Sequence, residues 1–216
     1  MEMKWKEEVS QIVKGSGIEL DDRHKDFVSY ISAPLEFYHS KPKEYKSEAT
    51  KQNLETDYQR YLKDNDKWVL WYDIELPIGQ TKSECGRTIN KCFVDMIGEL
   101  KVGKRPVIGE LKYYDKYKGS VADHPFEATI QLLAYYCMIM KNADILEGVR
   151  HKPVDPFEWK KLRNNPILML RANNDYWDYW RENKKEERDE VLKQIINVCK
   201  DLDIQLWDEN GPIEYL

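Results

Sequence analysis

Residues 90–115 constrain the fold of this chain more than any other stretch, because they carry the pattern of an antiparallel hairpin. Two apolar runs, 92–100 and 107–114, flank a short connection of sequence Lys-Val-Gly-Lys. Apolar runs on either side of a short Gly-containing connection are typical of two paired strands. The stretch therefore predicts two adjacent antiparallel strands.

The register of this hairpin brings three charged side chains together. With the turn centred between Val102 and Gly103, Asp95 falls directly opposite Glu110, and their Cβ atoms should lie roughly 5 Å apart. Side chains alternate along a strand, so Glu110 and Lys112 point to the same face. Two carboxylates and one ammonium group are therefore expected to converge on one place.

Glu-x-Lys alone carries little information in a chain that is 34% charged and contains the pattern six times. Only the copies that begin at Glu99 and Glu110 lie in apolar, strand-like runs. Asp95 is on the same strand as Glu99 and cannot oppose it. Glu110 and Lys112 are therefore the pair that an opposing Asp can complete.

The opposed carboxylates have two interpretations. Alternating polar residues usually form the solvated face of a hairpin, so the first interpretation is that Asp95 and Glu110 are surface charges. Like charges that oppose each other destabilise a sheet unless something compensates them. A divalent cation with oxygen ligands is the natural compensation, and a metal site is the second interpretation.

An Asp on one strand followed by Glu-x-Lys on the next resembles the motif of the PD-(D/E)XK nuclease superfamily. Asp95, Glu110 and Lys112 carry the resemblance, and Val94 stands where the family's Pro would precede the Asp. The Pro is the most variable part of the family pattern. The resemblance implies a nuclease that hydrolyses phosphodiester bonds with Mg²⁺ or Mn²⁺.

The segment that follows the hairpin adds a second motif. Asp-His-Pro at 123–125 predicts a helix start, and an apolar stripe at steps of four and three follows it. Gln131 and Tyr135 lie four residues apart beside this stripe. Gln-x-x-x-Tyr at this place is similar to the extra motif of the RecB-like and lambda-exonuclease-like branch of the superfamily. The alternative is that Tyr135 is an aromatic residue at the edge of the core and Gln131 a solvent-facing amide.

The order of the other predicted elements also fits that superfamily. Helices are predicted at 2–14, 22–39, 44–63 and 175–202, and further strands at 68–76, 166–171 and, as a last edge strand, 204–207. The resemblance implies a restriction-endonuclease-like αβββαβ core over 44–172, in which helices flank a mixed central sheet. Residues 1–43 would be a helical N-terminal extension and residues 173–216 a C-terminal helix and tail, so that 1–216 is a single α/β domain.

The resemblance also implies which residues hold the metal. Asp95, Glu110 and the backbone carbonyl of Leu111 would bind one or two Mg²⁺ or Mn²⁺ ions, which prefer oxygen ligands. Nuclease domains of this kind carry a further Glu on the first core helix, and Glu55 is the best match, approaching the metal directly or through water. Glu48 is the alternative. A solvated helix face is the interpretation without a function.

In the same resemblance, Lys112 positions the attacking water and offsets phosphate charge. Gln131 and Tyr135 orient Lys112 or the phosphate through hydrogen bonds. Lys116 and Lys118 lie just beyond the site, where they would follow the nucleic-acid backbone. Nucleic acid is therefore the expected partner, with DNA favoured over RNA.

No helix-turn-helix or other sequence-reading element is apparent, so end- or structure-dependent cleavage is expected, and an exonuclease is favoured over an endonuclease. The net charge of −5 argues against a broadly basic protein that coats nucleic acid. A protein partner or a homo-oligomer would supply a missing basic surface. Two alternatives remain: a nuclease fold that binds nucleic acid or protein without hydrolysis, and a nonenzymatic α/β interaction domain with exposed aromatic residues.

The sequence also bears on the compartment. The first ten residues lack the apolar segment of a secretory signal, and the longest apolar run, 132–140, is too short to span a bilayer. The four cysteines are dispersed with no Cys-x-x-Cys pair, so neither a zinc site nor a disulfide framework is expected. A soluble cytoplasmic protein with no membrane partner is the expectation.

Overall fold

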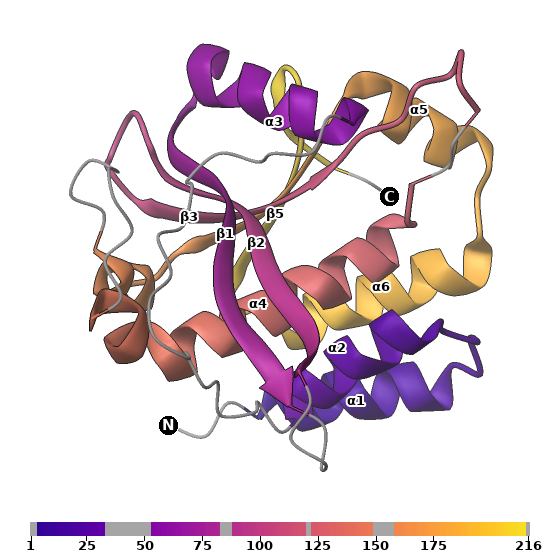
Figure 1. Cartoon of the computed structure of the whole chain (residues 1–216). Helices are drawn as coiled ribbons and strands as arrows, with labels where there is room; N and C mark the ends of the chain where they lie inside the picture. The colour runs from indigo at the N-terminus through magenta and orange to yellow at the C-terminus, as the bar shows by residue number, and fades with distance from the viewer. Residues whose placement is uncertain (1–3, 33–52, 83–87, 120–121, 149–157, 215–216) are drawn as a thin grey trace.

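The computed structural model describes residues 4–32, 53–82, 88–119, 122–148 and 158–214. They form an α/β fold with one mixed six-stranded sheet flanked by helices (Figure 1). The helices are α1 (Trp5–Gly15), α2 (Asp22–Ser32), α3 (Leu54–Asn65), α4 (Pro125–Gly148), α5 (Asn174–Glu182) and α6 (Glu186–Val198), with a 3₁₀ helix η1 (Trp159–Arg163). The strands are β1 (Val69–Lys82), β2 (Thr88–Leu100), β3 (Pro106–Lys112), β4 (Ile167–Ala172), β5 (Asp203–Asp208) and β6 (Gly211–Ile213).

The strands follow one another across the sheet in chain order. β1, β2 and β3 pair antiparallel, β3, β4 and β5 pair parallel, and β6 pairs antiparallel with β5. Parallel neighbours need a long crossover, and α4 supplies the one between β3 and β4. Apart from the short η1, the predicted order of helix, three strands, helix and strand is observed from α3 to β4.

The hairpin of β2 and β3 has the predicted register. Met96 lies opposite Gly109, as expected from a turn centred in the Lys-Val-Gly-Lys connection. The paired ladder stops there, so Asp95 and Glu110 are the next residues beyond it. The two acidic residues therefore lie where the strands begin to part.

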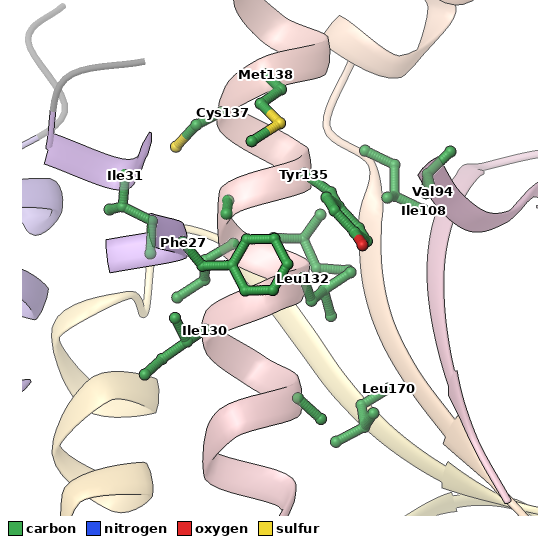
Figure 2. Packing of buried hydrophobic residues seen from close by; sticks show 14 of the residues in the cluster. Phe27, Ile31, Val94, Ile108, Ile130, Leu132, Tyr135, Cys137, Met138 and Leu170 are labelled. Atoms are coloured by element: carbon green, nitrogen blue, oxygen red, sulfur yellow. The ribbon is translucent and has the colours of Figure 1, made fainter. Parts of the chain in front are cut away.

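The two faces of the sheet carry different helices. α3 covers one face, and α4 covers the other together with α1, α2 and α6 (Figure 1). Alternation along β3 sorts its apolar side chains: Ile108 belongs to the hydrophobic cluster on the α4 side, whereas Val107 and Leu111 belong to the cluster on the α3 side. Figure 2 shows the α4-side cluster, in which side chains of α2, α4 and the sheet meet.

Two glycines on neighbouring strands make room for Trp71 of β1, which lies in the α3-side cluster. A Cβ atom at Gly98 would collide with the carbonyl oxygen of Leu70, and one at Gly109 would lie 2.9 Å from Cη2 of Trp71. Both copies of the sequence Gly-Glu-Leu-Lys begin with one of these glycines. The packing of Trp71 thus accounts for the glycine at the start of both copies.

The C-terminal segment differs from its prediction. Instead of one helix over 175–202, the chain forms α5 and α6, and Asn183 ends α5 by donating from its backbone N–H and its Nδ2 to the carbonyl of Tyr179. The break lets the apolar residues of both helices reach the α4-side cluster. The strand predicted at 204–207 is β5, but it is not the edge of the sheet, because β6 pairs outside it.

At the N-terminal side, α2 agrees with the described part of the helix predicted at 22–39. The helix predicted at 44–63 begins later than expected, at Leu54, because Asn53 has an extended backbone and caps α3. Residues 33–52 lie outside the described part of the chain. Cys92, Cys137 and Cys199 are buried free thiols. Of the helices that the structure describes, none is long and apolar enough to cross a membrane.

Candidate functional site

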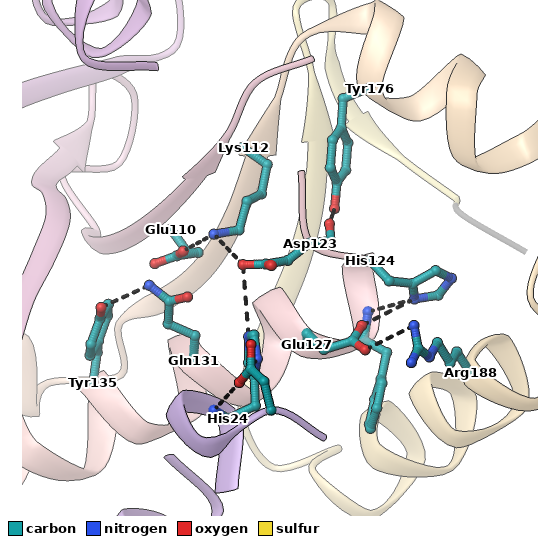
Figure 3. A network of polar contacts seen from close by, with 12 residues as sticks. His24, Glu110, Lys112, Asp123, His124, Glu127, Gln131, Tyr135, Tyr176 and Arg188 are labelled. Carbon is teal, nitrogen blue, oxygen red and sulfur yellow. Dashed lines mark hydrogen bonds and ion pairs between the residues drawn. The ribbon is translucent and has the colours of Figure 1, made fainter. Parts of the chain in front are cut away.

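Glu110 and Lys112, at the end of β3, form a buried ion pair. Lys112 Nζ donates a hydrogen bond of 2.7 Å to Glu110 Oε1 (Figure 3). Glu110 is fully buried and Lys112 is 4% exposed. Alternation along β3 brings them to one face, because Leu111 between them points into the cluster on the α3 side. A solvated hairpin face is therefore the wrong interpretation for Glu110.

Asp95 joins this pair from β2, just beyond the last paired residues of the two strands. Its Oδ2 accepts a 2.8 Å hydrogen bond from the backbone N–H of Leu111. A side-chain oxygen thus satisfies a backbone donor just beyond the last paired residues of β2 and β3. The bond ties Asp95 to β3 directly beside Glu110, as the register of the hairpin predicts.

Burial at this site opposes the negative charge of its carboxylates. Burial and the neighbouring Asp95 raise the pKa of Glu110 well above its ordinary value, while Lys112 acts in the opposite direction. Burial also raises the pKa of Asp95. Burial works against the charge of Lys112, but the surrounding carboxylates, above all that of Glu110, outweigh it and raise its pKa. Such a site favours the uptake of a proton or of a cation.

Glu55, in the first turn of α3, belongs to the same group of charges. Burial raises its pKa to about 7, an effect that Lys112 opposes and Asp95 strengthens. Asn53 fixes the start of this helix, because its side chain accepts a 2.7 Å hydrogen bond from the backbone N–H of Thr56. Glu55 is partly buried, so it is not part of a freely solvated helix face. Glu48, the alternative, lies outside the described residues.

Gln131 and Tyr135 reach the site from α4 (Figure 3). Gln131 Nε2 donates a 2.7 Å hydrogen bond to the hydroxyl oxygen of Tyr135, and both side chains are buried. Burial raises the pKa of Tyr135 well above its ordinary value, with Glu110 and Asp95 adding to the effect. Gln131 is thus not a solvent-facing amide. Tyr135 does lie in the α4-side cluster, but its hydroxyl oxygen accepts the bond from Gln131 on the side where Glu110 lies (Figure 3).

Three charged side chains of the site escaped the sequence analysis. Asp123 Oδ2 lies 3.4 Å from Lys112 Nζ and 3.7 Å from Nε2 of His24 on α2. The Arg23 guanidinium lies 5.5 Å from the centre of the Phe27 ring. Burial works against the charge of Arg23, but Tyr135, Glu110 and Asp123 outweigh it and raise its pKa, which places Arg23 near the same group. Asp123 lies just before α4, the helix of the Gln-x-x-x-Tyr motif, so the sequence could have suggested it as a site residue. Nothing in the sequence of α2 suggests that Arg23 or His24 reaches the site.

The donor atoms fit a hard divalent cation, but their present contacts do not form a complete metal site. Across the described ranges, no three His, Cys, Asp or Glu side chains lie close enough together to hold a metal ion. The ammonium group of Lys112 occupies Glu110 Oε1, whereas Glu110 Oε2 has no hydrogen-bond partner among the described atoms. Carboxylate and carbonyl oxygens of Asp95, Glu110, Glu55 and Leu111 are the ligands that Mg²⁺ prefers. A cation that used both oxygens of Glu110 would therefore displace Lys112 from Oε1, whereas a cation bound through Oε2 alone would leave that ion pair in place.

Lys116 and Lys118, predicted to contact nucleic acid, lie in the exposed turn after β3. Lys116 Nζ is 3.2 Å from Oδ1 of Asp175 and 5.4 Å from the centre of the Tyr117 ring. The turn continues the strand that carries Glu110. The two lysines are therefore exposed to solvent a few residues beyond Lys112.

Comparison with known proteins gives no match: no protein-family model, no curated protein and no solved structure is similar to this chain.

Proposed function

We propose that this protein is a divalent-cation-dependent nuclease that hydrolyses phosphodiester bonds of DNA. The observation that carries the proposal is the meeting of five polar side chains in one buried group, contributed by β2, β3 and α4: Asp95, Glu110, Lys112, Gln131 and Tyr135. Burial raises the pKa values of Asp95 and Glu110, and buried carboxylates of this kind are costly for folding and gather at functional sites.

The arrangement of elements supports the same proposal. The order from α3 to β4 agrees with the αβββαβ core of restriction-endonuclease-like enzymes. The acidic residues lie where β2 and β3 stop pairing, on the face that α4 covers. We therefore propose a restriction-endonuclease-like core with the metal site at this point of the hairpin.

Bound Mg²⁺ or Mn²⁺ would supply an activated water and neutralise the charge that develops on the phosphate. Asp95, Glu110 and the carbonyl of Leu111 would hold the cation, and Glu55 would complete the set directly or through water. Glu110 and Glu55 both have raised pKa values. They would therefore release protons when the cation binds, and cation affinity would rise with pH.

The cationic and amide side chains would act on the substrate. The ammonium group of Lys112 would orient the attacking water and offset phosphate charge. Gln131 and Tyr135 are already hydrogen-bonded to each other and would hold Lys112 or the phosphate in place. Lys116 and Lys118 would follow the DNA backbone beyond the scissile bond.

The decisive test is cleavage of end-labelled linear DNA and of closed circular DNA, single- and double-stranded, with Mg²⁺, with Mn²⁺ and with EDTA. We expect cleavage of linear DNA that EDTA abolishes and that Lys112→Ala lacks. Lys193→Ala, at an exposed lysine of α6, is the matched control and should cleave normally. Cleavage of circles would make the enzyme an endonuclease instead of the favoured exonuclease.

Cation binding can be tested without a substrate. Isothermal titration with Mg²⁺ in two buffers of different ionisation enthalpy should show proton release that increases as the pH is lowered from 8 to 6. Asp95→Asn should abolish the heat of binding, because it removes one charged ligand while its side-chain oxygen can still accept from the N–H of Leu111. Binding without proton release would contradict the assignment of Glu110 and Glu55.

One observation favours a second candidate, a nuclease-like module that binds without hydrolysis. In the described structure Lys112 is bonded to the carboxylate that the metal would need. If that ion pair persists, DNA binding would continue with no cleavage in any cation, and Lys112→Ala would bind DNA as well as the wild type. That result, with no heat of Mg²⁺ binding, would replace the nuclease proposal by this one.

A further inference from the structure

Lys112 has a second carboxylate within reach, and that carboxylate is connected to α2. Asp123 Oδ2 lies 3.4 Å from Lys112 Nζ and 3.7 Å from Nε2 of His24 (Figure 3). His24 Nδ1 lies 2.8 Å from Oδ1 of Asp21, which also accepts a 2.8 Å hydrogen bond from the backbone N–H of His24. The four side chains form a line from the ammonium group at the end of β3 to the surface.

The ring of His24 is buried and is held at Nδ1 and on one face. Its residue is 3% exposed, and its ring meets Phe27 edge to face at 5.9 Å. Because the Asp21 carboxylate accepts from Nδ1, that nitrogen carries a proton. Nε2 then points toward Asp123 and has no hydrogen-bond partner in the described part of the chain. A buried ring nitrogen of this kind is costly unless it interacts with the group in front of it.

Asp123 is also held in place. Its backbone carbonyl accepts a 2.7 Å hydrogen bond from the hydroxyl group of Tyr176 on α5. Its side chain is 34% exposed, so water still reaches its carboxylate, whereas Glu110 is fully buried. Asp123 is therefore a suitable second partner for the ammonium group if a cation takes Glu110 Oε1.

We propose that α2 is part of the active site, and that His24, held by Asp21, orients Asp123 so that Asp123 keeps the Lys112 ammonium group in place when Glu110 turns to a cation. The inference rests on the nuclease function proposed above for the use of Lys112. His24 and Asp123 are positioning residues, because they act through Lys112. Without Asp123, release of Glu110 would leave a buried ammonium group unpaired, which is strongly unfavourable.

The first test needs no nuclease activity. The ¹⁵N chemical shifts of the His24 ring are measured by NMR in cation-free protein, with the signals assigned through His24→Gln. The charged groups along the line are Asp21 at Nδ1, Asp123 in front of Nε2, and Lys112 beyond Asp123. Asp123→Asn should shift the Nε2 signal, because the group 3.7 Å from this nitrogen loses its carboxylate.

Two further variants complete this test. Lys112→Met should also shift the Nε2 signal of His24, because Asp123 loses the ammonium group that lies 3.4 Å from its carboxylate. Asp22→Asn, at an exposed residue of the same helix that pairs with Lys25, is the matched control and should cause a much smaller change. Unchanged Nε2 signals in both Asp123→Asn and Lys112→Met would overturn the inference, whether or not the protein cleaves DNA.

The second test uses cleavage, provided that the wild type is active. His24→Ala should lower kcat about tenfold or more with little change in KM, because Lys112 is displaced while the substrate contacts remain. His24→Gln should restore much of the rate, because its amide group reaches the place of Nε2. Full activity of His24→Ala would refute the positioning role and leave the nuclease proposal intact. An inactive wild type would refute the nuclease proposal, and the NMR result would still decide whether His24 interacts with Asp123.

Discussion

Replacement of Glu55 by Gln should stabilise the protein at pH 8 in the absence of divalent cations and leave its stability at pH 4 nearly unchanged. Burial raises the pKa of Glu55 from an ordinary value of 4.5 to about 7. Between these two values the folded protein keeps the Glu55 proton, whereas the unfolded chain has already lost it. The stability contributed by this group is therefore present below pH 4.5 and is lost as the pH rises through about 7.

The size of the effect follows from the two pKa values. Each unit of difference corresponds to about 1.4 kcal/mol, so the difference between 4.5 and about 7 gives roughly 3 kcal/mol of lost stability. Glu55 is partly exposed, and screening by solvent reduces this figure to about 2 kcal/mol. Gln cannot ionise, so the variant escapes the loss.

The assay is urea denaturation of both proteins at pH 4 and at pH 8 with EDTA present, comparing the change in unfolding free energy between the two pH values. Asp57→Asn, at an exposed residue of the same helix, is the control for a change of net charge on α3. Equal losses of stability in the wild type and Glu55→Gln, or a Gln variant that is less stable at pH 8, would refute the electrostatic argument. If Glu55 is a ligand of the proposed cation site, saturating Mg²⁺ should reverse the order, because only the wild type keeps this carboxylate.

Three further outcomes follow from the packing and the buried histidine. Gly98→Ala should lower the unfolding free energy by about 1–3 kcal/mol in urea, because its Cβ would collide with a backbone oxygen of β1, whereas Gly15→Ala, which meets nothing within 4 Å, should be neutral or stabilising. Trp177→Phe should lower the free energy of unfolding by about 1–3 kcal/mol, measured by thermal denaturation, because the carbonyl of Trp207 loses its 2.9 Å hydrogen bond from Trp177 Nε1. Burial lowers the pKa of His124 to about 3, so its ring signals in NMR should not titrate between pH 7 and 4. Because the unfolded chain takes up a proton at this residue in that range, His124→Gln should lose less stability on acidification than the wild type. Titration of the ring near pH 6.5 would contradict both statements.

The hairpin and the acidic pair could be predicted because both depend on local pattern. Alternation along β3 assigns Glu110 and Lys112 to one face, and the centre of the turn then selects Asp95 as the neighbour across the strands. Gln131 could be proposed for the same site only because its helix directly follows β3. These inferences need nothing beyond the spacing of residues within one hairpin and the element next to it.

The rest of the site could not be predicted, because it depends on contacts between distant segments. His24 reaches Asp123 from a helix that precedes the proposed core, and no spacing in the sequence relates the two. The break between α5 and α6 has a similar cause: residues 183–185 contain neither Gly nor Pro, and the chain turns there because both helices pack into one cluster. β6 has three residues, too few to show an alternating pattern.

The hydrogen bond from Leu111 to Asp95 limits which residues position 95 could accept over evolutionary time, apart from any role in the proposed chemistry. A descendant of this chain without that chemistry would still need an acceptor for the backbone N–H of Leu111. Asn is reached from an Asp codon by a single base change and keeps a side-chain oxygen at the same distance along the side chain. Such a descendant should therefore carry Asn at position 95 far more often than Ala or an apolar residue.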